Sequence, residues 1–275
     1  MKKVLTIQDI SCFGQCSLTV ALPLISACQV ETVILPGAVL STHTSGFKHF
    51  TFCDLSDEFP KIENSWKQEN IKFDAFYTGY VCAGQIESIL NIVQSCAAPG
   101  ALRIVDPVMA DNGKMYPGFG PDFPAMMRKL CCGADCILPN LTEAAFLLER
   151  EPVLENYDQA YIEELCRGLY GIGAKTVVLT GVSFEADKLG FAVYDGQEFK
   201  YYFNKRRTRS SHGTGDVYAS IFTGAVMNGY SFFDAASFAA DMVCECLDIT
   251  PEDHWYGVSF EAVIPELVRR LAEKK

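Results

Sequence analysis

Short apolar runs alternate with longer amphipathic stretches along this chain. The apolar runs are nearly uninterrupted, as expected for strands that are buried on both faces of a sheet. They are Val4–Gln8, Thr32–Pro36, Ala75–Thr78, Leu102–Val105, Cys136–Leu138 and Thr176–Thr180. Helical patterns lie between them, near Leu18–Ala27, Ile86–Ser95, Thr142–Leu148 and Tyr161–Tyr170. This alternation predicts an α/β fold, with a doubly wound, mostly parallel sheet and helices on both faces.

The last third of the chain has a different pattern. Residues 190–194 and 199–203 resemble strands, and the turn-forming sequence 195–198 between them predicts an antiparallel hairpin. Helical patterns then follow at about 216–228, 232–247 and 259–272. No repeat, low-complexity tract or linker interrupts the sequence, so we expect a single domain over residues 1–275.

Composition limits the class of protein. The chain has 275 residues, enough to bury a substantial core, and its net charge is −11. This acidic balance disfavours nucleic acid and anionic membrane as partners. No apolar stretch is long enough to span a membrane, and Asp9 interrupts the start before any segment of signal-peptide length. We therefore expect a cytoplasmic protein without membrane association.

The cysteines and the basic residues form no obvious site. Twelve cysteines and four histidines are present, but there is no C-x-x-C pair and the histidines are not clustered near the cysteines. We expect free, mostly buried thiols in a reducing compartment. The basic run 205–209 either offsets the phosphate charge of a nucleotide or forms a solvated strand end. The sequence leaves both interpretations open.

The segment Ser211–Asp216 carries the clearest chemical signal. Gly213 and Gly215 allow close backbone approach to a ligand, and the apolar run 217–222 predicts a helix that begins there. The free N–H groups of a helix start form an anion site. A carboxylate at such a site suits a reaction in which Asp216 takes a hydroxyl proton while the N–H groups of Gly213, Thr214 and Gly215 receive phosphoryl charge. Alternatively, Asp216 merely caps the helix.

No Walker-type phosphate loop is present. Residues 79–84 have its glycine spacing, but Gln85-Ile86 follows in place of Lys and Ser/Thr. The helix start at Gly213 is therefore the best candidate for a phosphate cradle.

Two acidic residues follow predicted strands. Asp111 and Glu143 would lie at the ligand crevice of a doubly wound sheet, where they could serve Mg²⁺ directly or through water. By position alone, the favoured interpretations are a turn at residues 111–113 and a first-turn acid at Glu143 that answers the helix dipole.

Six short motifs are spread over the chain from residue 7 to about residue 228. They are Ile7-Gln8 with Phe13-Gly14, Leu40-Ser41-Thr42-His43-Thr44, Thr78-Gly79-Tyr80, Asp106-Pro107-Val108, Pro139-Asn140-Leu141-Thr142-Glu143 and Gly213-Thr214-Gly215-Asp216. In content and order, they resemble the motifs of the pyridoxal kinase branch of the ribokinase-like superfamily.

The resemblance implies transfer of the γ-phosphoryl group of ATP to the 5′-hydroxymethyl group of pyridoxal, pyridoxamine or pyridoxine. It implies that Asp216 is the general base, with the backbone of Gly213, Thr214 and Gly215 as the anion hole. It places Mg²⁺ at Asp111 and Glu143. On the ATP side it implies Asp106, Asn140, Thr180, Gly181, Gly213 and Thr214, and on the acceptor side Asp9, Ser11, Thr44 and Tyr80. It also implies a homodimer.

Three positions qualify the resemblance. Leu138 stands where relatives often carry a threonine near a monovalent-cation site, so a monovalent cation requirement is left open. Asp9 stands where many pyridoxal kinases have a serine against the ring nitrogen. It could accept a charge-assisted bond from a pyridinium, or turn away as a loop residue so that Ser11 contacts the ring. Phe13 could add apolar area to the pocket, whereas His43 and Cys12 are left out of the chemistry.

Other functions compete with a vitamin B6 kinase. His212 before the glycine turn resembles hydroxymethylpyrimidine kinases, so that activity, or both activities, is the close alternative. A non-catalytic vitamin-binding protein is less favoured, because a binder has no need for Asp216, Asp111 and Glu143 together.

Overall fold

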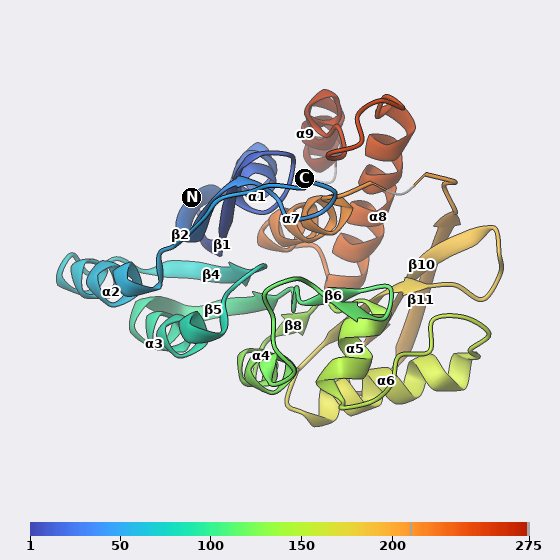
Figure 1. The fold of residues 1–275 in the computed structure, drawn as a ribbon, viewed down its shortest axis with the longest axis horizontal. Helices are drawn as coiled ribbons and strands as arrows, with labels where there is room; N and C mark the ends of the chain where they lie inside the picture. The colour runs from blue at the N-terminus through green and yellow to red at the C-terminus, as the bar shows by residue number, and fades with distance from the viewer. Residues whose placement is uncertain (210, 274–275) are drawn as a thin grey trace.

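The computed structural model describes residues 1–209 and 211–273, and within these ranges nine strands form one sheet (Figure 1). Their order is β11-β10-β9-β8-β5-β4-β1-β2-β3. The strands are β1 (Lys3–Phe13), β2 (Glu31–Thr42), β3 (Phe52–Asp54), β4 (Phe73–Thr78), β5 (Ala97–Val105), β8 (Cys136–Ile137), β9 (Val177–Val182), β10 (Lys188–Tyr194) and β11 (Phe199–Lys205). From β2 to β9 all neighbours are parallel, and β3, β10 and β11 add antiparallel edges.

Helices cover both faces of the sheet (Figure 1). One face carries α1 (Leu18–Ala27), α7 (Thr214–Met227), α8 (Phe232–Ile249) and α9 (Ile264–Glu273). The other carries α2 (Phe59–Gln68), α3 (Ile86–Cys96), α4 (Phe123–Cys131), α5 (Leu141–Leu147) and α6 (Gln159–Gly171). Successive side chains of a strand point to opposite faces of the sheet, so the core has two layers. Tyr77 lies in the layer with α7, and its neighbour Phe76 lies in the opposite layer. The predicted doubly wound α/β fold is confirmed.

Several elements differ from the sequence prediction. Helices α2 and α4 were not predicted, because Pro60 and Pro124 interrupt their patterns; both prolines lie in the first turn, where a missing N–H costs nothing. Strand β1 continues beyond the predicted run to Phe13, and its pairing with β2 has a bulge between Gln8 and Ile10. The last helix begins at Ile264, after a short 3₁₀ turn, and not at residue 259.

All twelve cysteines lie in the described ranges and are free thiols. Half of them are buried: Cys28, Cys96, Cys131, Cys136, Cys166 and Cys246. The expectation of free thiols is confirmed, whereas "mostly buried" holds for only half. Among the residues that the structure describes, none of the helices has the length and hydropathy needed to cross a membrane.

Candidate active site

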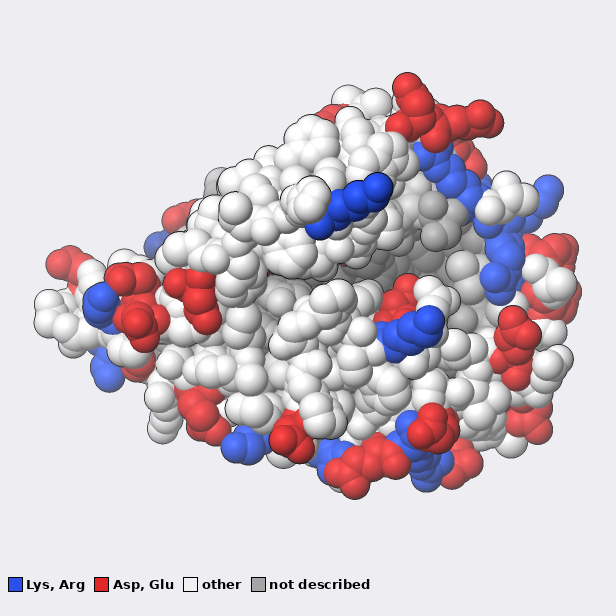
Figure 2. All heavy atoms as spheres, in the orientation of Figure 1, with Lys and Arg blue, Asp and Glu red and all other residues white. Residues whose placement is uncertain are grey.

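A cavity of about 550 Å³ opens at the carboxyl ends of the central strands, and Figure 2 shows the hollowed face. The structure brings all the residues predicted for catalysis, metal, ATP and acceptor binding into the lining of this one cavity. They are Asp9, Ser11, Thr44, Tyr80, Asp106, Asp111, Asn140, Glu143, Thr180, Gly181, Gly213, Thr214, Gly215 and Asp216. Phe13 is the exception among the residues predicted for the pocket wall. Their individual roles remain predictions.

Helix α7 begins at the floor of the cavity. Gly213 precedes it with a φ of 81°, and a Cβ there would collide with the carbonyl oxygen of Gln15. Only glycine tolerates both conditions. The first-turn N–H groups of such a helix have no carbonyl partner within it. They are therefore available to an anion in the cavity.

Asp216 lies in this first turn and is enclosed by protein except where it meets the cavity. Burial raises the pKa of Asp216 to about 7, and the charge of Asp9 adds to the rise. The N–H of Ser17 and the thiol of Cys16 donate toward the carboxylate and lower its pKa. A carboxylate with a pKa near neutrality is suited to accept a proton from a hydroxyl group.

Asp9 and Ser11 lie together on β1. Asp9 is only 4% exposed, and the Ser11 hydroxyl donates to its Oδ2 at 2.9 Å. Burial raises the pKa of Asp9, while the hydroxyls of Ser17 and Ser11 lower it. Asp9 is thus a strand residue at the cavity and not a loop residue that turns away. Both candidates for the ring contact remain, joined by a hydrogen bond.

Aromatic and imidazole rings surround this end of the cavity. Tyr80 packs against Phe119 with 5.1 Å between ring centroids. His43, left out of the predicted chemistry, also lines the cavity; its Nε2 donates to the Tyr256 carbonyl at 2.6 Å and its Nδ1 accepts the Ser45 N–H at 3.1 Å. These contacts hold a neutral imidazole, and burial lowers its pKa.

The prediction that Phe13 adds apolar area to the pocket is wrong. Its ring is 50% exposed and packs against Phe47 and Tyr256, outside the cavity lining found in the described residues. Because β1 continues to residue 13, it carries this side chain past the cavity.

Glu143 stands at the start of α5 and is 3% exposed. Its Oε2 accepts the Asn140 N–H at 2.9 Å and its Oε1 accepts the Met109 N–H at 3.1 Å. The side-chain amide of Asn140 also donates to the Ala110 carbonyl at 2.8 Å. Glu143 is therefore an acidic residue in the first helical turn, as one interpretation predicted, and it forms a capping box with Asn140. Glu143 also lines the cavity.

Asp111 lies on a small ribbon made by β6 (Ala110–Asp111) and β7 (Lys114–Met115). Asn112 and Gly113 connect the strands with φ values of 50° and 75°, as in a type I′ turn. The Asp111 carboxylate accepts the Asn112 N–H at 2.8 Å with Oδ1 and the Asn112 side-chain amide at 3.0 Å with Oδ2, and Asp111 lines the cavity. The turn interpretation is correct, and the same turn presents Asp111 to the site.

The cavity is strongly acidic. Burial, followed by the charges of Glu143 and Asp216, raises the pKa of Asp106 well above its usual range. Two arginines line the cavity, but Arg207 is paired with Asp248 and Arg209 donates to backbone carbonyls. Crowded carboxylates with no free cation nearby, among the described lining residues, fit a bound divalent cation. Asp111 and Glu143 could then hold Mg²⁺, with Glu143 acting through water since both its oxygens already accept N–H bonds.

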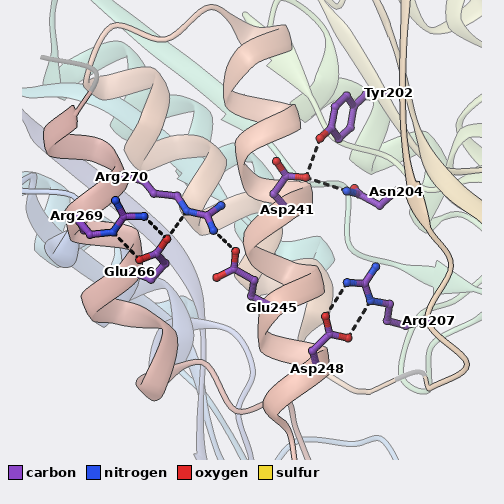
Figure 3. Close-up of polar contacts among 9 residues, drawn as sticks. All are labelled: Tyr202, Asn204, Arg207, Asp241, Glu245, Asp248, Glu266, Arg269 and Arg270. Atoms are coloured by element: carbon purple, nitrogen blue, oxygen red, sulfur yellow. Dashed lines mark hydrogen bonds and ion pairs between the residues drawn. The ribbon is translucent and has the colours of Figure 1, made fainter.

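The other end of the cavity lies between α8 and the β10–β11 hairpin (Figure 3). Asp241 of α8 accepts the Tyr202 hydroxyl at 2.7 Å and the Asn204 amide at 2.8 Å. Arg207 reaches Asp248 with two nitrogens, at 2.9 and 2.6 Å. Lys205 ends β11 and is exposed, as is Arg206, which agrees with a solvated strand end. Arg207 and Arg209 line the cavity but are held by these contacts, and a role toward phosphate stays a prediction. Apolar residues of α8 supply the wall: Ala240, Val243, Cys244 and Leu247.

Several residues at the site carried no sequence signal. Ser17 contacts both Asp9 and Asp216 from a backbone with a φ of 56°, in the left-handed region that favours glycine. Tyr116 lies among the acidic residues; burial raises its pKa, and the negative charges of these residues raise it further. The α8 wall has an ordinary amphipathic pattern. None of these contacts follows from local sequence.

Comparison with known proteins identifies the family. A family model described as phosphomethylpyrimidine kinase matches residues 24–256. The chain belongs to this family. The chain is 26% identical over 278 residues to pyridoxal kinase PdxY of Actinobacillus pleuropneumoniae, covering 95% of this chain and 94% of the relative. It spans only 44% of the length of the chloroplastic thiamine biosynthetic bifunctional enzyme of Arabidopsis thaliana, at 26% identity over 237 residues.

Solved structures of this kinase family are also similar. The pyridoxal kinase of Lactobacillus plantarum has a TM-score of 0.90 at 30% identity, with 99% of each chain covered. A Bacteroides thetaiotaomicron protein assigned to the phosphomethylpyrimidine kinases was solved with pyridoxal; it has a TM-score of 0.90 at 32% identity, covering 98% of this chain and 96% of that one. The resemblance drawn from the motifs is confirmed, and kinase family membership makes this protein a phosphotransferase.

Proposed function

We propose that this protein transfers the γ-phosphoryl group of ATP to the 5′-hydroxymethyl group of pyridoxal, pyridoxamine or pyridoxine. One observation carries the proposal: Asp216 and the start of α7 line one cavity together with Asp9 and Thr44, which we propose for the acceptor, and with Asp111 and Glu143, which we propose for the metal. The relatives named for pyridoxal kinase, and the related structure that contains pyridoxal, support this substrate class.

In the proposed reaction, Asp216 takes the proton of the hydroxymethyl group as the oxygen attacks the γ-phosphorus. A new P–O bond forms while the bond from the γ-phosphorus to the β–γ bridging oxygen breaks, and ADP leaves. The N–H groups of Gly213, Thr214 and Gly215 stabilise the charge on the transferring group. Asp9 holds the protonated ring nitrogen with Ser11 beside it, and Thr44 and Tyr80 line the ring pocket.

The ATP side completes the proposed site. Asp106, Asn140, Thr180 and Gly181 border the path of the phosphates, and the slot between α8 and the β10–β11 hairpin would take the rest of the nucleotide. Mg²⁺ bound through Asp111 and Glu143 would neutralise phosphate charge and orient ATP. Leu138 lines the cavity without a side-chain oxygen to offer, so we propose that its side chain does not bind a monovalent cation; a requirement for such a cation stays open.

Phosphorylation of hydroxymethylpyrimidine is the second candidate, favoured by the family match and by His212 at the cavity. A coupled assay of ATP consumption with pyridoxal, pyridoxamine, pyridoxine and hydroxymethylpyrimidine separates the candidates. Turnover of the B6 vitamers with kcat/KM at least tenfold above that for the pyrimidine is the expected result. Binding without turnover of any acceptor would indicate the non-catalytic alternative.

We further propose a cytoplasmic homodimer. Twelve free thiols are consistent with a reducing compartment. At one edge of the sheet, β3 is exposed and carries Phe52, which is 44% exposed, a surface that a second copy could cover. Light scattering of the purified protein tests the dimer.

A further inference from the structure

Gln85 is a fully buried amide close to the acceptor end of the candidate active site. It ends the 3₁₀ helix η2 (Ala83–Gln85) and is 0% exposed. Its Oε1 accepts the Cys82 N–H at 3.0 Å and completes a capping box at the start of η2. A glutamate could form the same capping box, because this role needs only an acceptor oxygen. The amide nitrogen of Gln85 therefore requires a separate explanation.

The amide nitrogen of Gln85 reaches across to two other segments. It donates to the Gly37 carbonyl of β2 at 2.8 Å and to the Ser56 hydroxyl at 3.0 Å. Ser56 begins the 3₁₀ helix η1 (Ser56–Glu58), which follows β3. The Gly37 carbonyl also accepts the Leu55 N–H at 3.0 Å. One side chain thus joins β2, the segment after β3 and the loop after β4.

Gly37 lies where the pairing of β1 with β2 is irregular. From one paired position to the next, β1 advances by two residues and β2 by three, so Gly37 and Ala38 stand opposite Asp9 alone. This is a β-bulge, and a bulge beside an active site can re-aim a side chain. A Cβ at Gly37 would lie 2.7 Å from Gln85 Oε1, so any larger residue would force the amide to move. The bulge and the Gln85 amide are therefore fitted to each other.

The segments that meet at Gln85 carry residues that we propose for the acceptor ring. Asp9 stands opposite the bulge, and the chain runs on from the bulge along β2 to Thr44 at the cavity wall. The loop after β4 carries Tyr80, which lines the same cavity. These segments are distant in sequence, and a single buried side chain holds them together.

We propose that Gln85 is a positioning residue for the acceptor, which fixes Asp9 and Tyr80 at the spacing that the ring requires. Gln85 is not among the described residues that line the cavity, so it acts on binding through the segments that it joins. Asp216 and the proposed ATP-side residues lie on other elements, so the chemical step and nucleotide binding should not depend on it. The inference rests on the proposed acceptor roles of Asp9 and Tyr80.

The test measures kcat, both KM values and the calorimetric Kd of pyridoxal in wild type, Gln85→Glu and Gln85→Ala. Glutamate keeps the acceptor for the Cys82 N–H, but it loses both donor bonds and brings a carboxylate close to Asp54, whose Oδ1 lies 3.5 Å from the amide nitrogen. Alanine loses all of these bonds. We expect the KM and Kd of the acceptor to rise by about tenfold in both variants, while kcat and the KM of ATP stay within about twofold.

Gly37→Ala tests the same contact without changing residue 85. The φ of Gly37 lies outside the left-handed region, so the effect of an added Cβ comes from the collision with Gln85 Oε1. The substitution should raise the acceptor KM in the wild-type background and add little in the Gln85→Ala background, where the collision is absent. Together with Gln85→Glu, it decides the question if Gln85→Ala does not fold.

Ile92→Ala is the matched control for a loss of stability. Ile92 is fully buried on α3, the helix that follows Gln85, so its truncation lowers the Tm without touching the joint at Gly37. It should leave both KM values in place.

An acceptor KM that stays at the wild-type value in Gln85→Glu overturns the positioning role, and so does a change of kcat and both KM values together. If wild type phosphorylates hydroxymethylpyrimidine but no B6 vitamer, the proposed substrate is wrong instead. The same comparison with hydroxymethylpyrimidine as the acceptor then decides the role of Gln85.

Discussion

Asn140 and Glu143 cap each other across the first turn of α5. Asn140 Oδ1 accepts the Glu143 N–H at 2.9 Å, and Glu143 Oε2 accepts the Asn140 N–H at 2.9 Å. The second carboxylate oxygen of Glu143 holds the Met109 N–H in the loop after β5. One side chain therefore joins that loop to α5 while it faces the cavity, which distinguishes it from Asp111 at the exposed tip of its ribbon.

Glu143→Gln should therefore lower both stability and Mg²⁺ affinity. Glutamine keeps one acceptor oxygen, but its NH2 group cannot accept the second N–H bond. We therefore expect a loss of about 1–3 kcal/mol in the free energy of unfolding. Asp111→Asn should lower the affinity for Mg²⁺ and leave stability unchanged, because the Asp111 carboxylate bonds only to the neighbouring Asn112. Urea unfolding and Mg²⁺ titration of the rate at fixed ATP measure the two effects. Unchanged titrations in both variants would leave these residues with turn and capping roles only.

Asp216→Asn should abolish turnover and leave vitamer binding within a few fold. The amide keeps the shape of the side chain and can still accept the Ser17 N–H, but it cannot take up the proton. Loss of a general base costs roughly 10²–10⁴ in rate. Steady-state kinetics with saturating Mg-ATP and calorimetric binding of pyridoxal test this expectation. A variant that keeps more than about a tenth of wild-type kcat would contradict the assignment of the base.

The same substitution should change how stability depends on pH. Burial raises the pKa of Asp216 in the folded protein to about 7, whereas an aspartate in the unfolded chain has a pKa near 3.8. The folded state binds more protons between these values, so the contribution of Asp216 to stability falls as the pH rises from about 4 to 7. Without metal or nucleotide, Asp216→Asn should be more stable than wild type at pH 8, and the difference should shrink at pH 5. Thermal unfolding at both pH values measures it, and a pH-independent difference would argue against a raised pKa.

Asp9, more than Ser11, should set the pH dependence of vitamer binding. A hydrogen bond between a carboxylate and a protonated ring nitrogen is about twice as strong as a hydrogen bond between neutral groups. Asp9→Ser should therefore weaken binding most at pH values where the wild-type complex holds that proton. The measurement is the vitamer Kd across pH for wild type, Asp9→Ser and Ser11→Ala. If Asp9→Ser is silent and Ser11→Ala costs about 1 kcal/mol or more, Ser11 is the ring contact.

The central strands were predictable because they are buried on both faces and read as apolar runs. Their register was not, since it depends on contacts between strands. Helices α2 and α4 were hidden by Pro60 and Pro124, which are harmless only because each lies in a first turn. Sequence pattern shows that a proline is present but not which turn of a helix it occupies.

Most of the nominated site residues stand at strand ends or helix starts, beside turn-forming residues, which sequence can reveal. Asp9 and Ser11 lie within β1 and lack this property. Ser17 directly precedes α1, but the sequence does not show that its backbone is left-handed and meets Asp216. Such roles arise from packing between segments about two hundred residues apart. The prediction for Phe13 failed for a related reason. The length of β1, which the sequence pattern did not show, carries its side chain past the cavity.

The contact between α1 and α7 also has a consequence for synthesis of the chain. Helix α1 packs against α7, and its buried residues Val20 and Leu24 belong to the same core layer. After α1, a ribosome must add residues 28–213 before α7 and α8 emerge to cover that layer. Until then the growing chain exposes apolar surface, which invites aggregation and engagement by chaperones. Helix packing over such distances should also make refolding slow, and truncation before α7 should yield an insoluble product.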